Sequence, residues 1–522
     1  MTNTPFFSGG VSRRGILKGA SAIGGAAVLG PLGARMARAQ PRRGGTLRIG
    51  VAHGSTTDSL DPGSSENDFT ILMAHVRGNF LTEIAPDGSL VPEVAEGWEA
   101  SADARSWVFT IRSGVSFHSG REVTAEDVIA SINHHRGEES TSAAKPIVSD
   151  ITEMRADGMN VHITLAAGNA DFPFIMSDYH IPILPAINGA IDPQTTDGCG
   201  PYAIEELEMG VGARLVRHDG YWKPNSAFFD AVEITAIHDD AARQNALISG
   251  QIDYIDTVDL NTVHLLQRAP GIEILSVTGT QHYGLPMDTR AAPFSDNNVR
   301  LALKYAIDRE QMVETVLNGY GAIGNDHPIG PGQRFFNTEL EQKTYDPDRV
   351  RFHLREAGIE SLSVDIHLAE STFAGAIDAG VLFSETAAAA GIDLTVVREP
   401  NDGYWSNVWM QLPFTGTYWG GRPTEDWMFT TTYSEGAPWN ESYWSHERFN
   451  QLLVDARAEL DQDLRREMYF EMQRLVSDEG GTIIPMFANY VGAHGNHLVR
   501  PDTVATNWRN DGHRIAERWW FA

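Results

Sequence analysis

The strongest constraint on how this 522-residue chain can fold lies shortly after its first hundred residues. Residues 107–112 (Trp-Val-Phe-Thr-Ile-Arg) alternate apolar and polar side chains, which is typical of a strand with one buried face. Glycine-containing turns follow at Gly114 and Gly120. Thr124 and Asp127 then have the spacing of a helix capping box, and apolar residues at helical spacing come after them. The stretch predicts a strand, two turns and a capped helix in a mixed α/β fold.

Charge, length and cysteine content each limit what the chain can be. The chain carries 69 acidic against 40 basic residues, a net charge of −29, and such a surface repels phosphate backbones, so we expect no nucleic-acid partner. A 522-residue chain of ordinary globular composition is expected to form two or three domains. Its one cysteine, Cys199, excludes an internal disulfide, and its position between two glycines favours a small buried turn residue over a reactive thiol.

The first 39 residues have the pattern of an export signal. Arg13-Arg14 resembles a twin-arginine motif, a Gly/Ala-rich run follows, and Ala37-Arg38-Ala39 is a small-x-small cleavage site. The apolar run is too short and too polar for a membrane span. No cysteine lies near the cleavage site, so we expect a periplasmic protein without a lipid anchor that begins at Gln40.

Three runs of residues carry a family resemblance. They are AEGWEASAD at residues 95–103, FTIRSGVSFHSG at 109–120 and TAEDV at 124–128. In this order they resemble the family-5 extracellular solute-binding proteins of ABC importers, a family that includes dipeptide, oligopeptide and nickel receptors. PFSDNNVR at residues 293–300 and AIDR at 306–309 match the same family further along the chain.

The resemblance implies the periplasmic-binding-protein fold of type II, cluster C-like, with two α/β lobes around a ligand cleft and a small extra domain. Its partners would be a small solute and the permease subunits of an ABC importer, and a monomer is expected. The predicted division of the chain is a signal peptide at 1–39, lobe I at 40–80, 190–282 and 480–522, the extra domain at 81–189, and lobe III at 283–479.

Motifs of catalysis and of cofactor binding were searched for and not found. The sequence has no Gly-x-Ser-x-Gly elbow, no His-Glu-x-x-His helix and no Cys-x-x-Cys pair. Residues 319–324 spell G-x-G-x-x-G, but they follow a helical pattern where the dinucleotide fingerprint needs a strand. His134 and His135 are adjacent on a predicted helix and cannot both face one ion. We therefore expect a binding protein with no cofactor and no metal; a secreted hydrolase is a remote alternative.

An aromatic, glycine-rich stretch is the candidate ligand-binding segment. Four of the twelve tryptophans lie between residues 419 and 444. Tryptophan and tyrosine beside glycines favour a concave site lined by aromatic rings, although packing into the core is the alternative for each ring. Trp405 and Trp409, four residues apart, are expected to pack inward from one helix face.

The same stretch departs from the peptide receptors of the family. Those receptors usually have an aspartate that pairs with the α-amine of the peptide, whereas this chain reads Trp419-Gly420-Gly421-Arg422, with acids only at Glu425 and Asp426. Arg422 could bind a carboxylate or a phosphate through its planar fork, or it could be an ordinary surface residue. The tryptophans could stack on sugars or hold an organic cation.

These observations lead to one function with several open ligand classes. A short peptide or amino-acid derivative is the first expectation; an oligosaccharide, an opine-like conjugate, an organic cation or a metal complex remain alternatives. His53 follows an alternating strand and is a candidate cleft residue, with an ordinary loop histidine as the alternative. The predicted ligand-binding residues are His53, Tyr283, Tyr418, Trp419, Arg422, Asp426, Trp427 and Trp439.

Overall fold

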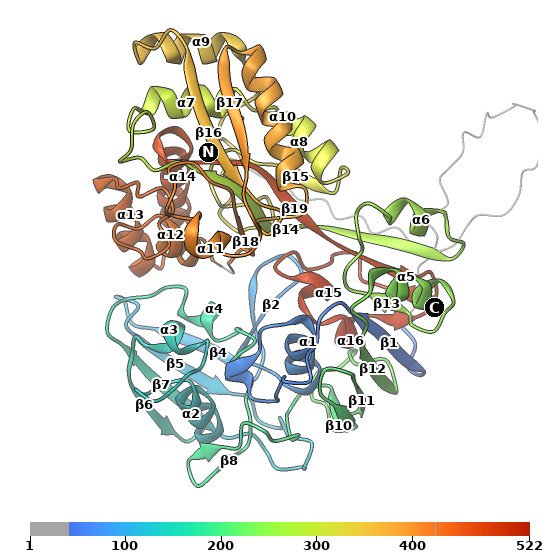
Figure 1. The fold of residues 1–522 in the computed structure, drawn as a ribbon. Coiled ribbons are helices and arrows are strands. Elements are labelled where there is room, and N and C mark those ends of the chain that lie inside the picture. The colour runs from blue at the N-terminus through green and yellow to red at the C-terminus, as the bar shows by residue number, and fades with distance from the viewer. Residues whose placement is uncertain (1–40, 423) are drawn as a thin grey trace, which may run out of the picture. The chain divides into compact units, whose positions relative to one another are not determined.

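A nine-stranded sheet runs through the chain and joins its distant segments. The computed structural model describes residues 41–422 and 424–522, so the predicted signal peptide lies outside the described residues. The order of the sheet is β10-β11-β12-β1-β13-β19-β14-β18, and β15 pairs with β19 off this path (Figure 1). Its strands are β1 (Thr46–Val51), β10 (Tyr202–Glu208), β11 (Gly212–Arg217), β12 (Ala231–Ala236), β13 (Tyr254–Ile255), β14 (Ile272–Pro286), β15 (Gly321–Ile323), β18 (Thr417–Trp419) and β19 (Thr482–Gly495).

Strands β14 and β19 are the longest and cross from one end of the molecule to the other. They pair antiparallel, but the pairs Thr278–Asn489 and His282–Phe487 are separated by four residues on β14 and by two on β19. Two extra residues therefore bulge out of β14 between Thr278 and His282. A bulge bends and twists a strand pair locally, so the crossing strands change direction here.

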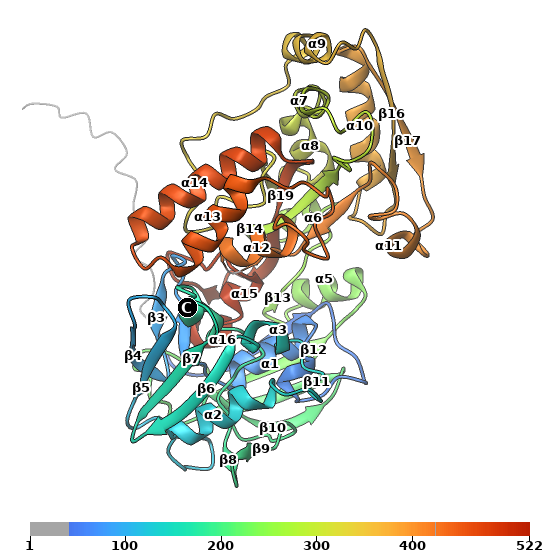
Figure 2. The same ribbon diagram turned by 90° about the vertical axis from the view of Figure 1, so that its left-hand side faces the viewer.

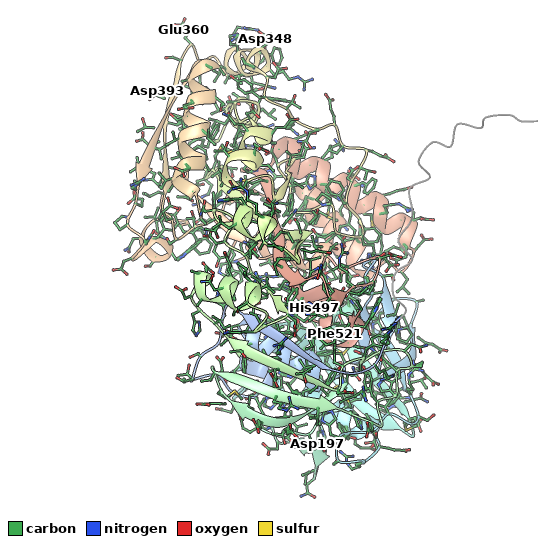
Figure 3. The ribbon with its side chains drawn as sticks, turned by 90° about the vertical axis from the view of Figure 1, so that its right-hand side faces the viewer. Asp197, Asp348, Glu360, Asp393, His497 and Phe521 are labelled. Atoms are coloured by element: carbon green, nitrogen blue, oxygen red, sulfur yellow. The ribbon has the colours of Figure 1, made fainter. Side chains whose placement is uncertain are left out.

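One end of this sheet carries the N-terminal and C-terminal segments. The helices here are α1 (Asp68–Arg77), α5 (Asp240–Ile248), α6 (Val263–Arg268), α15 (Arg509–Gly512) and α16 (Ile515–Arg518), with a 3-10 turn at Pro62–Ser64. The C-terminal strand β21 (Trp520–Phe521) pairs with β20 (Leu498–Val499), and the rings of Phe521 and His497 stack at 5.7 Å (Figure 3).

Residues 82–191 build a second, smaller sheet with its own apolar core. Its order is β4-β5-β7-β6, and helix α2 covers one face (Figure 2). The bounds are β2 (Thr82–Ile84), β3 (Leu90–Pro92), β4 (Ala95–Ala100), β5 (Ser106–Ile111), α2 (Ala125–His134), α3 (Lys145–Val148), β6 (Ile151–Asp157), β7 (Asn160–Leu165), α4 (Phe172–Ile175), β8 (Ala186–Ile187) and β9 (Ala190–Ile191). The predicted strand, turns and capped helix are confirmed: Thr124 is the N-cap, and its N–H donates to Asp127 at 2.9 Å.

Residues 297–479 form helices around a parallel strand pair. The elements are α7 (Asn297–Tyr305), α8 (Arg309–Val316), α9 (Pro347–Glu356), β16 (Leu362–Leu368), α10 (Ala376–Ala389), β17 (Ile392–Arg398), α11 (Tyr404–Asn407), α12 (Glu425–Thr432), α13 (Glu447–Ala458) and α14 (Gln462–Glu479). The predicted strand–helix–strand alternation is confirmed, because α10 connects the parallel strands β16 and β17. The expectation that Trp405 packs inward is wrong: α11 ends at Asn407, and 38% of Trp405 is exposed.

Cys199 is fully buried, as its position between glycines predicts. Its thiol lies 3.6 Å from the carbonyl oxygen of Ile183, and burial raises its pKa to about 12. Gly200 next to it approaches the backbone of Arg77 so closely that a Cβ would lie 2.4 Å from the carbonyl carbon. The glycines therefore allow two chain segments to touch, and the cysteine fills the space beside them.

A buried network of charges links strands β2 and β3 to the C-terminal helix α16. Glu93 is fully buried and accepts hydrogen bonds from Arg514 at 2.7 and 2.9 Å and from Lys223 at 2.8 Å. Glu517 accepts from Arg514 at 2.8 Å and pairs with Lys223 at 2.9 Å. Each buried carboxylate thus faces two cations, which offsets the cost of removing these charges from water.

Glu93→Ala should destabilise the protein by about 3 kcal/mol, the lower end expected for breaking a buried ion pair, because Arg514 and Lys223 stay buried and lose one of the carboxylates that they share but keep Glu517. Urea unfolding measures the loss. Glu99→Ala, an exposed site on β4 of the small sheet, is the control and should change the free energy of unfolding by less than about 0.5 kcal/mol. Equal stabilities for the two variants would show that the network contributes little.

Candidate functional site

A cavity of about 360 Å³ lies beside the bulge of the crossing strands, where segments far apart in sequence converge. Two larger hollows, of about 530 and 640 Å³, are each lined only by residues between 305 and 478. The smaller cavity is the candidate site because it draws its wall from seven separate segments of the chain. Its lining residues are His53, Glu66, Asn67, Asp68, Ile71, Tyr179, Gln281, Gly420, Tyr490, Trp508, Arg509 and His513.

Asp68, the first residue of helix α1, is the electrostatic centre of one wall. It accepts hydrogen bonds from His53 Nδ1 at 2.8 Å and from Arg509 Nη1 at 3.0 Å. Burial alone would raise the pKa of Asp68, but the hydrogen bond from His53 and the charge of Arg509 lower it to about 2. The same hydrogen bond raises the pKa of His53. Asp68 is therefore ionised at neutral pH and accepts a hydrogen bond from each of the two side chains.

Asp256 lies behind this wall in the opposite electrostatic state. Its side chain is buried and accepts the N–H of Ala52 at 3.0 Å. Burial, together with the nearby charge of Asp68, raises the pKa of Asp256 to about 7. One carboxyl near the cavity thus stays ionised while the other takes up a proton near neutral pH.

This raised pKa makes stability depend on pH. The folded state holds the proton of Asp256 up to about pH 7, whereas the unfolded chain loses it near 3.8. The contribution of Asp256 to the free energy of unfolding is therefore present at low pH and is lost as pH rises from about 3.8 to about 7. When the pH is raised from 5 to 7, the free energy of unfolding of the wild type should therefore fall by about 2 kcal/mol more than that of Asp256→Asn. Urea unfolding at several pH values checks this; parallel curves for the two proteins would contradict it.

The aromatic stretch forms a group of side chains beside the cavity, called the aromatic wall below. Only Gly420 of this stretch is among the residues that line the cavity. Trp419 ends strand β18, and its indole lies 5.9 Å from that of Trp439. The guanidinium of Arg422 lies over the rings of Trp419 at 5.5 Å and Trp427 at 5.9 Å. The structure therefore brings four of the predicted residues together in one cluster of rings around a cation.

Glu441 holds this aromatic wall from behind. Its carboxylate is buried and accepts hydrogen bonds from Trp409 Nε1 at 2.5 Å, Thr417 Oγ1 at 2.6 Å and Trp419 Nε1 at 3.0 Å. Burial raises its pKa. Among the described residues no cation lies within ion-pair distance of Glu441, so the three polar hydrogens alone compensate its burial and fix both indoles.

Glu441→Ala should lower the free energy of unfolding by about 1–3 kcal/mol, because three buried donors lose their acceptor. Urea unfolding gives this energy, and tryptophan fluorescence reports the freed indoles. Glu360→Ala, at an exposed surface position (Figure 3), is the matched control and should leave both signals unchanged. An unchanged spectrum in Glu441→Ala would show that the carboxylate does not position the rings.

The other predicted site residues have different surroundings. His53 lines the cavity. Tyr418 is 46% exposed and packs edge-on against Trp405. Tyr283 is buried in an apolar core, where its ring stacks on Phe373 at 4.2 Å, and it is not among the lining residues.

Asp426 is buried and ion-paired with Arg457 at 3.1 Å, and burial raises its pKa to about 6. For Tyr283 and Asp426 the surroundings give no support to a ligand contact. The binding assignments of all eight residues remain predictions.

Several residues of the cavity, and Glu441 behind the aromatic wall, carry no signal in the sequence. Asp68 and Arg509 are 441 residues apart, Trp508 directly precedes Arg509, and Tyr179 comes from a third segment. Glu441 follows a tryptophan-rich run without any motif of its own. Only the fold brings these side chains together.

One group of carboxylates has the spacing of a metal site. The oxygens of Glu83, Glu93 and Glu517 lie within 4.8 Å of one another, and it is the one such group among the described residues. Lys223 and Arg514 already donate to these oxygens. The cations neutralise the cluster, so its donor set does not fit a metal ion.

Comparison with known proteins decides the family. The family described as bacterial extracellular solute-binding proteins, family 5, middle part, matches residues 89–441, more than half of the chain. This chain belongs to that family. It is therefore a solute-binding protein, and the fold is that of the family's periplasmic binding proteins. None of the helices that the structure describes is long and apolar enough to cross a membrane.

Individual relatives differ in how much of the chain they match. The heme-binding protein A of Haemophilus influenzae is 29% identical over 296 residues, 51% of this chain and only 53% of its own length. The dipeptide-binding protein of Escherichia coli is 24% identical over 76% of this chain and 80% of its own. The glutathione-binding protein GsiB of Salmonella typhimurium is 23% identical over 87% of this chain and 92% of its own length.

Solved structures agree with the fold. The structure of HbpA2 from Haemophilus parasuis has a TM-score of 0.81 at 19% identity and covers 92% of this chain and 100% of its own. The periplasmic binding protein AgaA of A. tumefaciens in complex with agropinic acid has a TM-score of 0.70 at 23% identity, covering 92% and 99%. These similarities establish the architecture of this chain.

Proposed function

We propose that this protein captures a short peptide or an amino-acid derivative in the periplasm and delivers it to the permease subunits of an ABC importer. The observation that carries the proposal is the cavity beside the β14–β19 bulge, which combines charged, amide and aromatic side chains from distant segments. The dipeptide-binding and glutathione-binding relatives, which match most of the chain, support this ligand class.

Hinge closure is the proposed mechanism. Two lobes and a small extra domain, divided as the sequence predicts, would close around the solute by bending at the bulge between Thr278 and His282. A solute that contacts both walls binds the closed form more tightly and shifts the population towards it. No step of this mechanism makes or breaks a bond in the solute, so the proposed role is not enzymatic.

Export and state of assembly belong to the same proposal. The twin-arginine motif at Arg13-Arg14 would direct the chain to the periplasm as a monomer without a lipid anchor, with cleavage after Ala39. The mass of the protein recovered from a periplasmic extract tests the cleavage site.

An opine-like conjugate is the second candidate ligand. Arg422 next to two tryptophan rings suits a solute that combines an acid with a sugar-like or ring-shaped part. The structure solved with agropinic acid supports including this class in the test.

A thermal-shift panel on the chain from Gln40, unfolded and refolded to remove bound ligand, tests the function. The panel contains di- and tripeptides, glutathione, opine-like conjugates, oligosaccharides, organic cations, hemin and chelated nickel. A ligand at 100 times its dissociation constant should stabilise the fold by about 2.7 kcal/mol. Stabilisation by peptides or amino-acid derivatives is the expected result. Stabilisation only by another class of compound would show that the proposed ligand class is wrong. If no compound stabilises the protein, the proposed function is contradicted.

Trp419→Ala should weaken binding of the stabilising ligand at least about tenfold, or about 1.4 kcal/mol, because the indole forms part of the wall beside the cavity. Calorimetry measures the affinity. Phe352→Ala on α9, an aromatic side chain that is 48% exposed, is the control. If Trp419→Ala and Arg422→Ala both bind as tightly as the wild type, the aromatic wall is not the binding site.

A further inference from the structure

The loop that follows strand β18 is built to hold Arg422 at one fixed place. Gly421 has a φ of +82°, and a Cβ there would lie 2.0 Å from the hydroxyl oxygen of Thr280. Only glycine tolerates both the backbone angle and this contact. The loop is therefore pressed onto the bulge of β14, and Gly420, two residues before Arg422, lines the cavity.

The guanidinium of Arg422 has almost no partner in this place. Its one hydrogen bond within the described residues runs from Nη1 to the carbonyl oxygen of Gly421 at 2.7 Å. Two indole faces cover part of the group. Burial lowers the pKa of Arg422, while the more distant Tyr179 and Asp178 oppose the shift. Asp178 lies 2.6 Å from His180 Nδ1 and makes no ion pair with Arg422 among the described residues.

Three other buried or half-buried arginines of this part of the chain are paired with acids. Arg509 pairs with Asp68 at 3.0 Å. Arg457 pairs with Asp426 at 3.1 Å. Arg465 pairs with Asp171 at 2.7 Å. Arg422 differs from these three because no carboxylate of the described residues lies within ion-pair distance of it.

An unpaired cation in such surroundings has a direct physical consequence. Removing a charge from water is unfavourable unless an opposite charge or several hydrogen bonds replace the water. A guanidinium offers a planar fork that matches the two oxygens of a carboxylate or a phosphate. A guanidinium in these surroundings therefore suits a planar or tetrahedral oxyanion.

We propose that Arg422 binds an anionic group of the solute, a carboxylate or a phosphate, and that this receptor is specific for acids or zwitterions. The inference rests on the proposed function, because it assigns the ligand chemistry of the region beside the same cavity, which Gly420 and Tyr179 line. Trp419 and Trp427 keep the guanidinium in place and shield it from water, and the solute supplies the missing charge.

The first test uses matched probes that differ only in charge. Each peptide or amino-acid derivative that stabilises the protein is compared as free acid, as phosphomonoester and as neutral carboxamide by calorimetry at constant ionic strength. The wild type should bind the better of the two anions at least tenfold more tightly than the amide. Arg422→Gln should remove this preference and leave the affinity for the amide unchanged, and Arg422→Lys should retain part of it.

Arg466→Gln is the matched control, because this exposed arginine on α14 pairs with Asp463 away from the cavity. It should keep the full preference for anions. Equal binding of acid and amide by the wild type, or an unchanged preference in Arg422→Gln, would overturn the inference while the receptor function stood.

The second test needs no knowledge of the solute. Phenylglyoxal modification followed by mass spectrometry should label Arg422 faster than Arg509 or Arg457, which are ion-paired. Sodium acetate or inorganic phosphate should slow labelling of Arg422 compared with sodium chloride of equal ionic strength, and should not slow labelling of Arg466. The more protective anion indicates whether the group is a carboxylate or a phosphate.

The two tests separate the two claims. Protection of Arg422 by small anions without binding of any peptide or amino-acid derivative would contradict the proposed ligand class and leave the anion site standing. Arg422 labelled at the same rate with and without acetate and phosphate would overturn the anion site.

Discussion

The pairing of β14 with β19 is the interaction on which the rest of the structure depends. These two strands, 15 and 14 residues long, are hydrogen-bonded along most of their length, yet they cannot stay in register across the bulge at residues 279–281. The bulge turns the backbone outward at the point where Gln281 reaches the cavity and Thr280 supports Gly421. One irregularity in a ladder therefore lies directly beside the cavity and supports the loop that carries Arg422.

Charge is distributed unevenly around this crossing. The Glu93–Arg514–Lys223 network fastens the small sheet to the C-terminal helix, and its charges are matched within the protein. At the aromatic wall the balance is incomplete: Glu441 is satisfied only by polar hydrogens, and Arg422 is left with one carbonyl. The network around Glu93, in which the charges are paired, suits a rigid support. The aromatic wall, in which Arg422 has no ion-pair partner among the described residues, suits the binding of a charged solute.

Much of the architecture follows from local sequence signals. The alternation at residues 107–112, the capping pair Thr124–Asp127 and the strand–helix–strand order near residue 380 predict elements that the structure contains, because these depend on neighbours in sequence. The site is harder to predict. Tryptophans that follow a glycine-rich run indicated one wall, but Asp68 and Arg509 meet only because the C-terminal segment returns to helix α1.

At two of the predicted positions, the surroundings of the side chain could not be read from the local sequence. Tyr283 lies in the apolar core that includes residues of α10. Asp426 stands where an anionic ligand contact is expected, but Arg457 from the next helix neutralises it. Neither partner is close in sequence, so no local pattern shows that these side chains are already occupied.

The burial of Cys199 has a practical consequence for fluorescence measurements of conformational change. Its thiol is fully buried and its pKa is raised to about 12, so the thiolate, which is the form that attacks a maleimide dye, is scarce at neutral pH. Cysteines introduced at exposed positions such as Ile187 and Glu360 would then be the reactive thiols of the described chain. A fluorophore pair can be attached without first removing the native cysteine and opening a void in the core.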